Sequence, residues 1–215
     1  MMIRPRSLYG IMILVWLLAG CCGHRTPVVH TTLDYQPVPD QEEEVRSEPK
    51  SEQELIKQVL SQNGYHRQRV KPTILLVTKK TRKLTLYYGT TPIRTYPVVL
   101  GANPKKDKLC QGDMCTPEGV YHVVCKYPHE RWNKFILLDY PNNQNWLKFA
   151  RAKKRGQISP LASIGGEIGI HGTDDDLRNI IGENWTFGCI SLQNHHLDDI
   201  YPLINEKTLV VIKKE

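Results

Sequence analysis

The stretch that decides the fold of this 215-residue chain runs from Ile170 to Leu192. It reads Ile170-His171-Gly172-Thr173 and then Thr186-Phe187-Gly188-Cys189-Ile190-Ser191-Leu192. A histidine therefore lies 18 residues before a cysteine that directly follows a glycine. A free thiol has a pKa of about 8.5 and is mostly protonated at neutral pH, so a nucleophilic cysteine needs a base. The pattern predicts that Cys189 is a nucleophile and that His171 is its general base.

The surroundings of both residues agree with this hypothesis. His171 follows an apolar, glycine-rich run at residues 164–170 that is typical of a buried strand, so we expect it at a strand end. Cys189 is predicted to lie just before a helix, because Asn194 is a suitable N-cap for residues 195–204. Gly188 lets the backbone approach a substrate carbonyl, so amides in this region are candidates for an oxyanion hole.

At these residues the chain resembles the YkuD-type L,D-transpeptidase catalytic domain family of bacterial peptidoglycan enzymes. That family carries His-Gly and then Ser/Thr-x-Gly-Cys at about this separation. The resemblance extends over roughly residues 72–214 and includes the hairpin at 74–88, the strand at 96–101, Thr116-Pro117-Glu118-Gly119 and the closing strand at 208–212. It implies a mainly β fold with a few helices, a β-sandwich or barrel of the L,D-transpeptidase type.

The resemblance also implies the chemistry. We expect a cysteine-dependent L,D-transpeptidase that acts on peptidoglycan stem peptides through an acyl-enzyme on Cys189, for cell-wall crosslinking or protein attachment, with no cofactor and no metal. A backbone carbonyl close to His171, of Gly172 or Thr173, is expected to orient its ring. The candidate substrate-binding residues are Thr186, Phe187, Ser191, Tyr140 and Trp185.

The chain departs from the family in two places. Many members have an arginine where this chain has Ser191, and several have a histidine where it has Phe187. The arginine is thought to order the site or to hold a substrate carboxylate, so its absence leaves the substrate open.

Two alternative functions follow. Residues 140–142 and 165–168 resemble a subgroup with hydrolytic members, so an L,D-peptidase that trims peptidoglycan or releases wall-bound lipoprotein is one alternative. An inactive, lipid-anchored wall-binding protein, with Ser191 as the sign of decay, is another. A papain-like or NlpC-type peptidase is disfavoured, because in those enzymes the cysteine precedes the histidine.

The N-terminus is typical of an exported protein. Arg4 and Arg6 precede the apolar run at residues 11–18, which leads into Leu18-Ala19-Gly20-Cys21. These four residues resemble the bacterial lipobox, which implies a lipoprotein signal peptide at residues 1–20 and lipidation of Cys21. Residue 22 is a cysteine and not an aspartate, which favours sorting to the outer membrane. The predicted location is the cell envelope, as a periplasmic lipoprotein.

Three further segments complete the predicted organisation. Residues 21–50 contain several prolines and an acidic run at 42–44, which is typical of a flexible linker. Ser51, with Glu54 three residues later, predicts the capping box of an N-terminal helix within residues 51–71, whose apolar face contains Leu55, Ile56, Val59 and Leu60. The catalytic domain is expected at 72–214. Its predicted strands are at 73–79, 83–88, 93–100, 119–125, 135–140, 167–171 and 208–212, and its further helices at 145–155 and 174–181.

The formal net charge of +7 suits an anionic partner such as the cell wall or a membrane surface. No basic stripe with interleaved aromatic residues is present, and no nucleic-acid-binding motif, so we expect no nucleic-acid partner. The predicted partners are peptidoglycan and a membrane reached through the lipid anchor.

The remaining cysteines raise the question of a metal or a disulfide. Cys110, Cys115, His122 and Cys125 have the spacing C-x4-C-x6-H-x2-C, but structural zinc sites usually show tighter knuckles. In an exported protein a disulfide is favoured. Cys110 and Cys115 are the candidate pair, while Cys125 is an alternative partner, so the connectivity stays open.

Overall fold

The computed structural model describes residues 51–65 and 71–215. The signal peptide, the lipidation of Cys21 and the linker predicted for residues 1–50 lie outside these residues. No helix in the described ranges is long and apolar enough to cross a bilayer.

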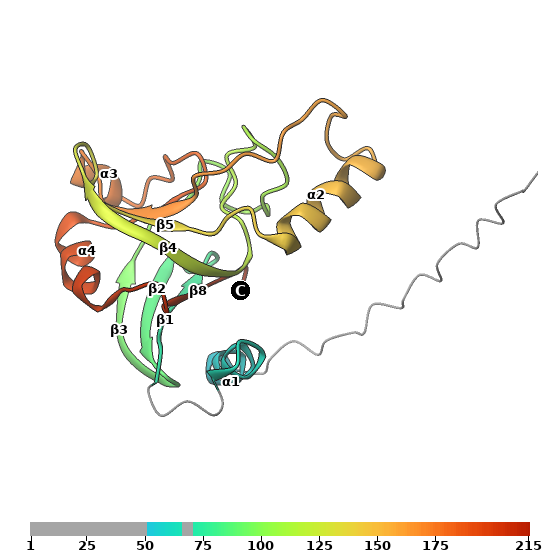
Figure 1. Cartoon of the computed structure of the whole chain (residues 1–215). Helices are drawn as coiled ribbons and strands as arrows, with labels where there is room; N and C mark the ends of the chain where they lie inside the picture. Colours follow the sequence, from blue (N-terminus) through green and yellow to red (C-terminus); the bar gives the residue numbers. More distant parts are fainter. Residues whose placement is uncertain (1–50, 66–70) are drawn as a thin grey trace, which may run out of the picture. The chain divides into compact units, whose positions relative to one another are not determined.

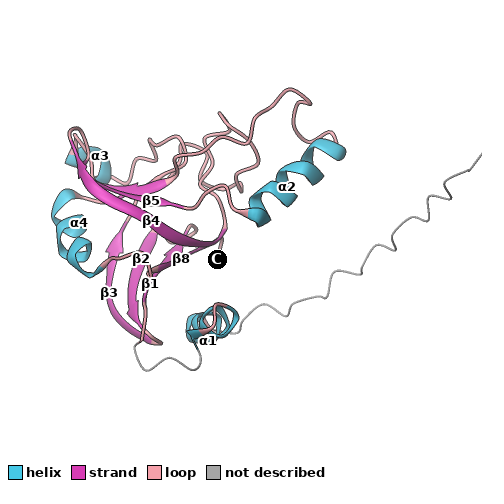
Figure 2. Ribbon diagram, viewed as in Figure 1, coloured by secondary structure: helices cyan, strands magenta, loops and turns pink. Residues whose placement is uncertain are grey.

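One eight-stranded sheet organises the domain, in the order β3-β2-β1-β8-β4-β5-β6-β7 (Figures 1 and 2). The strands are β1 (Thr73–Thr78), β2 (Lys83–Tyr88), β3 (Thr91–Pro97), β4 (Gly119–His129), β5 (Asn133–Leu138), β6 (Gly169–His171), β7 (Ile190–Ser191) and β8 (Leu209–Lys213). Two isolated bridges, Val99 with Ser191 and Gly101 with Thr186, bring the chain that follows β3 back to β7 at the opposite edge. The sheet therefore curls round on itself, and the predicted mainly β fold with a few helices is confirmed.

The central strand β1 is apolar on both faces. It pairs antiparallel with β2 and parallel with β8, so its backbone is hydrogen-bonded on both sides. Leu75 and Val77 point into the main core, while Ile74 and Leu76 point into a second core on the other face. This explains why the strand is a continuous apolar run instead of an alternating one.

Helix α1 (Glu52–Gln62) covers the second core. Ser51 caps it, because its Oγ accepts a hydrogen bond from the amide of Glu54 at 3.2 Å. Ile56 and Val59 are buried against β1 and β8, and Leu55 and Leu60 pack beside them. The helix predicted after Ser51, and its apolar face, are confirmed.

Three more helices and one turn of 3₁₀ helix surround the sheet. They are α2 (Asn143–Lys154), α3 (Asp176–Ile180), α4 (Asn194–Ile200) and the 3₁₀ helix η2 (Tyr201–Leu203). Helix α2 begins two residues earlier than predicted, because the side chain of Asn142 caps it and the side chain of Asn145 bonds back to the Asn142 amide. Helix α4 ends earlier than predicted because Pro202 lies in the next turn, where the chain tightens into η2.

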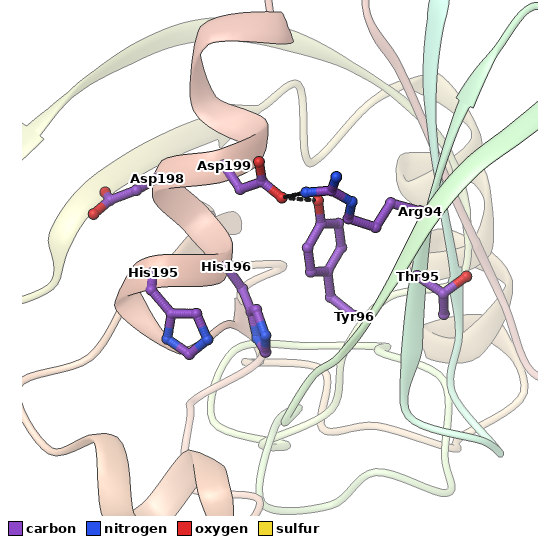
Figure 3. A pocket seen from close by; sticks show the side chains of 7 residues that line it. All are labelled: Arg94, Thr95, Tyr96, His195, His196, Asp198 and Asp199. Atoms are coloured by element: carbon purple, nitrogen blue, oxygen red, sulfur yellow. Dashed lines mark hydrogen bonds and ion pairs between the residues drawn. The ribbon is translucent and has the colours of Figure 1, made fainter.

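Helix α4 is fastened to the edge strand β3. The carboxylate of Asp199 accepts a hydrogen bond from the Tyr96 hydroxyl at 2.6 Å and pairs with the Arg94 guanidinium. Figure 3 shows both side chains reaching from β3 to the helix, beside His195 and His196. These contacts hold the C-terminal end of α4 against β3.

Candidate active site

Cys189 and His171 line one cleft of about 840 Å³. Strands β6 and β7 pair in parallel, with Ile170 opposite Ile190 and His171 opposite Ser191. His171 is the last residue of β6, as predicted, and Cys189 directly precedes β7. The expectation that Cys189 lies just before a helix is wrong, because β7 stands between it and α4. Strand pairing, not a helix start, brings the two residues into one cleft.

The ring of His171 packs against three aromatic rings. It stacks with Trp132 and with Phe135, with ring centroids 4.5 and 5.7 Å away, and Trp185 meets it edge-on at 5.5 Å. Its Nδ1 lies 2.7 Å from the carbonyl oxygen of Gly172. A carbonyl only accepts, so Nδ1 carries the proton and Nε2 keeps its lone pair.

Burial also sets the charge of His171. Removal from water lowers its pKa to about 4, although the hydrogen bond to Gly172 opposes this shift. The imidazole is therefore neutral at neutral pH. A neutral imidazole with a free Nε2 lone pair is the form that can act as a base.

The thiol of Cys189 is neutral as well. Burial raises its pKa to about 11, while the amide of Gly169 and the charge of Lys108 act in the opposite direction. Its Sγ donates to the carbonyl oxygen of Glu167 at 3.6 Å, and no hydrogen bond within residues 51–65 and 71–215 joins it to the His171 ring. Burial thus favours a neutral thiol and a neutral imidazole in the same cleft.

The residues before Cys189 form a tight, internally bonded turn. Gly188 has a φ of 138°, and a Cβ there would lie 2.7 Å from the carbonyl oxygen of Cys115. Its amide donates to the Thr186 hydroxyl at 3.2 Å, and that hydroxyl donates to the carbonyl of Cys189 at 2.7 Å. The Gly188 amide is therefore engaged by Thr186, while Gly188 itself allows the close approach that shapes the turn.

Three of the five predicted substrate-binding residues line the cleft, namely Trp185, Thr186 and Phe187. Phe187 is 78% exposed at the cleft wall, whereas Thr186 is buried.

The substrate contacts predicted for Tyr140 and Ser191 are wrong, because neither side chain reaches the cleft. Tyr140 is buried in the core, and its hydroxyl donates to the carbonyl of Ile164 at 3.2 Å. Ser191 is fully buried and donates to the carbonyl of Gly172 at 2.9 Å.

Sequence reasoning missed the cations of the cleft, Lys108, Arg131 and Arg178. Lys108 is buried, and its Nζ lies 2.8 Å from a carboxylate oxygen of Asp113. Arg178 lies over the Trp185 ring at 5.0 Å. These residues come from three separate segments, so no local motif could have grouped them. Each cation is already paired with a carboxylate of the chain: Lys108 with Asp113, Arg131 with Asp174 and Arg178 with Glu183.

The disulfide predicted between Cys110 and Cys115 is wrong, because both cysteines are free, as is Cys125. The Asp113 carboxylate closes this loop instead, since it accepts from the amides of Leu109, Cys110 and Cys115. Burial opposes its ionisation, but Lys108 and the backbone donors together lower its pKa. Within the part of the chain that the structure describes, no three His, Cys, Asp or Glu residues are grouped to hold a metal ion.

Comparison with known proteins agrees with this geometry. Residues 72–212 match the YkuD family, described as the L,D-transpeptidase catalytic domain. A search of curated proteins finds no match to the chain.

Solved structures show the same fold. Two structures of the helical cell shape determining protein Pgp2 from Campylobacter jejuni are similar. The K307A mutant has a TM-score of 0.54 and 23% identity, over 68% of this chain and 48% of that one. The unsubstituted protein has a TM-score of 0.52 and 22% identity, over 74% of this chain and 55% of that one. Bd1075 from Bdellovibrio bacteriovorus has a TM-score of 0.49 and 21% identity, over 68% and 49%.

The chain spans about half the length of these proteins. At this identity the likeness shows the fold alone. The family match, by contrast, covers most of the chain and contains both His171 and Cys189. The chain belongs to the YkuD family of L,D-transpeptidase catalytic domains.

Proposed function

We propose that this protein is a cysteine-dependent L,D-transpeptidase that acts on peptidoglycan stem peptides. The observation that carries the proposal is the placing of Cys189 and His171 in one cleft of a YkuD domain, with the His171 Nδ1 held by Gly172. Cys189 is the nucleophile in this proposal and His171 its general base.

The first step forms an acyl-enzyme. The Nε2 of His171 takes the thiol proton as Sγ attacks the carbonyl of the L-centre residue in an L,D-peptide bond. The Sγ–C bond forms, the C–N bond to the terminal D-residue breaks, and the leaving amine takes the proton back from His171. Because burial favours the neutral form of both side chains, we expect the thiol proton to move to His171 as Sγ attacks.

The second step resolves the thioester. An amine of a second stem attacks the acyl carbon and gives its proton to His171, and the Cys189 thiol is regenerated. Water in place of the amine would give hydrolysis, the alternative outcome of the same intermediate.

Incubation of the full chain with purified sacculi and tetrapeptide muropeptides tests the proposal. Mass spectrometry should find crosslinked dimers that lack one D-alanine, and the Cys189→Ala variant should make none. Tripeptides without new crosslinks would mean that the protein is a hydrolase and not a transpeptidase. No product from either protein, with the wall still bound, would refute the enzymatic proposal in favour of a binding protein.

We also propose a cellular setting. The lipobox-like residues 18–21 support anchoring through a lipid on Cys21, which would place the domain at the envelope beside its substrate. Pgp2, which shares the fold, is described as a helical cell shape determining protein, and we propose a role in cell shape for this protein as well. Growth with a labelled fatty acid should label the protein, and a Cys21→Ala variant that keeps the label would refute the anchor.

A further inference from the structure

An unbroken chain of hydrogen bonds leads from the cleft wall, at Trp185, through two buried side chains to the Gly172 carbonyl. The Trp185 Nε1 donates to the Oδ1 of Asn179 at 2.9 Å. The Nδ2 of Asn179 donates to the Oγ of Ser191 at 2.9 Å, and that hydroxyl donates to the carbonyl of Gly172 at 2.9 Å. This carbonyl is the one that holds the Nδ1 of His171. We call this chain the indole relay.

The direction of the indole relay is fixed by its first member. An indole N–H can only donate, so the oxygen of the Asn179 amide faces Trp185 and its NH₂ group faces Ser191. The Ser191 oxygen therefore accepts from Asn179, and its own proton is directed to Gly172. The Gly172 carbonyl thus receives two donors, the Ser191 hydroxyl and the His171 ring.

Burial makes each of these bonds matter. Ser191 is fully buried and Asn179 is 6% exposed, so water cannot replace a lost partner. In such surroundings hydrogen bonds are stronger, and an unpaired group is costly.

We propose that Ser191 and Asn179 are positioning residues that hold the Gly172 carbonyl against His171 and so keep Nε2 free as the base. The proposal rests on the function proposed above. Ser191, which stands where many family members have an arginine, then has a role of its own and is not a sign of lost activity. It acts on the base and not on the substrate.

The sharpest variant is Asn179→Asp. A carboxylate of the same shape still accepts from Trp185 but can no longer donate to Ser191, so the Ser191 hydroxyl turns toward it and away from Gly172. Ser191→Ala removes the same donor directly. Ser159→Ala, on the exposed loop after α2, is the matched control.

Two measurements on the full-length protein test the proposal. Nitrogen-15 NMR of labelled histidine, assigned with His171→Asn, should show protonated Nδ1 and bare Nε2 in the wild type, and a mixture of tautomers in both relay variants. With muropeptide substrate, kcat should fall about tenfold, the equivalent of about one lost hydrogen bond, while KM stays within twofold. The control should match the wild type in both.

An unchanged His171 tautomer in Asn179→Asp and Ser191→Ala would overturn the proposal, whether or not kcat falls, because the relay acts only through that ring. Thermal melts show whether each variant is folded. Should Ser191→Ala fail to fold, Asn179→Asp still tests the relay, because it keeps the size and shape of the side chain. The NMR measurement needs no substrate, so it decides the relay even where the peptidoglycan activity fails.

Discussion

Asn194 binds both backbone groups of Thr173. Its Oδ1 accepts from the Thr173 amide at 2.9 Å, and its Nδ2 donates to the Thr173 carbonyl at 3.0 Å. The first turn of α4 is thereby fastened to the chain directly after His171 and Gly172. The sequence predicted Asn194 as a helix N-cap, but the N-cap residue is Gln193. The side-chain amide of Asn194 instead binds Thr173, 21 residues earlier in the chain.

Asn194→Asp should therefore destabilise the protein. The carboxylate can still accept from the Thr173 amide, but it faces the Thr173 carbonyl with a second acceptor. We expect the free energy of unfolding to fall by about 1–3 kcal/mol. Urea denaturation measures this, with Asn143→Asp on the exposed face of α2 as the control. Equal stabilities of the two variants would contradict the role assigned to Asn194.

Gly172→Ala should be more damaging. A Cβ at this position would lie 2.2 Å from the Asn194 Oδ1 and 2.7 Å from the backbone oxygen of Trp132. Relief requires movement of the backbone that positions His171, so we expect a loss of about 3 kcal/mol or more, at the upper end of overpacking costs.

Gly166→Ala is the matched control for Gly172→Ala, because a Cβ there meets nothing within 4 Å. Urea denaturation of both variants, together with the wild type, gives the comparison. A Gly172→Ala variant as stable as Gly166→Ala would show that the site tolerates a side chain and would contradict the packing described here.

Much of the fold could be predicted from sequence because its signals are local. The apolar run of β1 and the turns around it predict strands, and Ser51 with Ile56 and Val59 predicts α1. The motif also placed His171 at a strand end and in the same cleft as Cys189.

The parts that failed depend on contacts made far along the chain. Proximity to Cys189 suggested that Ser191 touches substrate, but its strand position turns it into the core. The cysteine pattern favoured a disulfide, whereas in the structure the Asp113 carboxylate closes that loop by accepting from the amides of Cys110 and Cys115. Lys108 and Arg178 reach the cleft from distant segments, and no spacing rule joins them.

The reactivity of Cys189 should depend steeply on pH. Burial raises its pKa to about 11, so the thiolate fraction should rise about tenfold with each pH unit between 7 and 10. Iodoacetamide alkylation, followed by peptide mass spectrometry to separate Cys189 from the other free cysteines, measures this rate. The exposed Cys125 is an internal reference for reagent and pH. A rate that is already constant from pH 6 to 9 would mean a pre-formed thiolate–imidazolium pair.

His171 should make the protein sensitive to acid. Its folded pKa of about 4 lies below the ordinary value of 6.5, so between these two pH values the unfolded chain binds more protons than the native one. The contribution of this group to the free energy of unfolding is therefore full above pH 6.5. It falls as the pH drops toward 4, by about 3 kcal/mol in all.

His171→Asn removes the titrating group, so the free energy of unfolding of this variant should fall less between pH 7 and pH 4 than that of the wild type, by about this amount. Urea denaturation at both pH values measures the difference, in which the other titrating groups cancel. Parallel losses in the two proteins would mean that the His171 ring is not held neutral by burial among Trp132, Phe135 and Trp185.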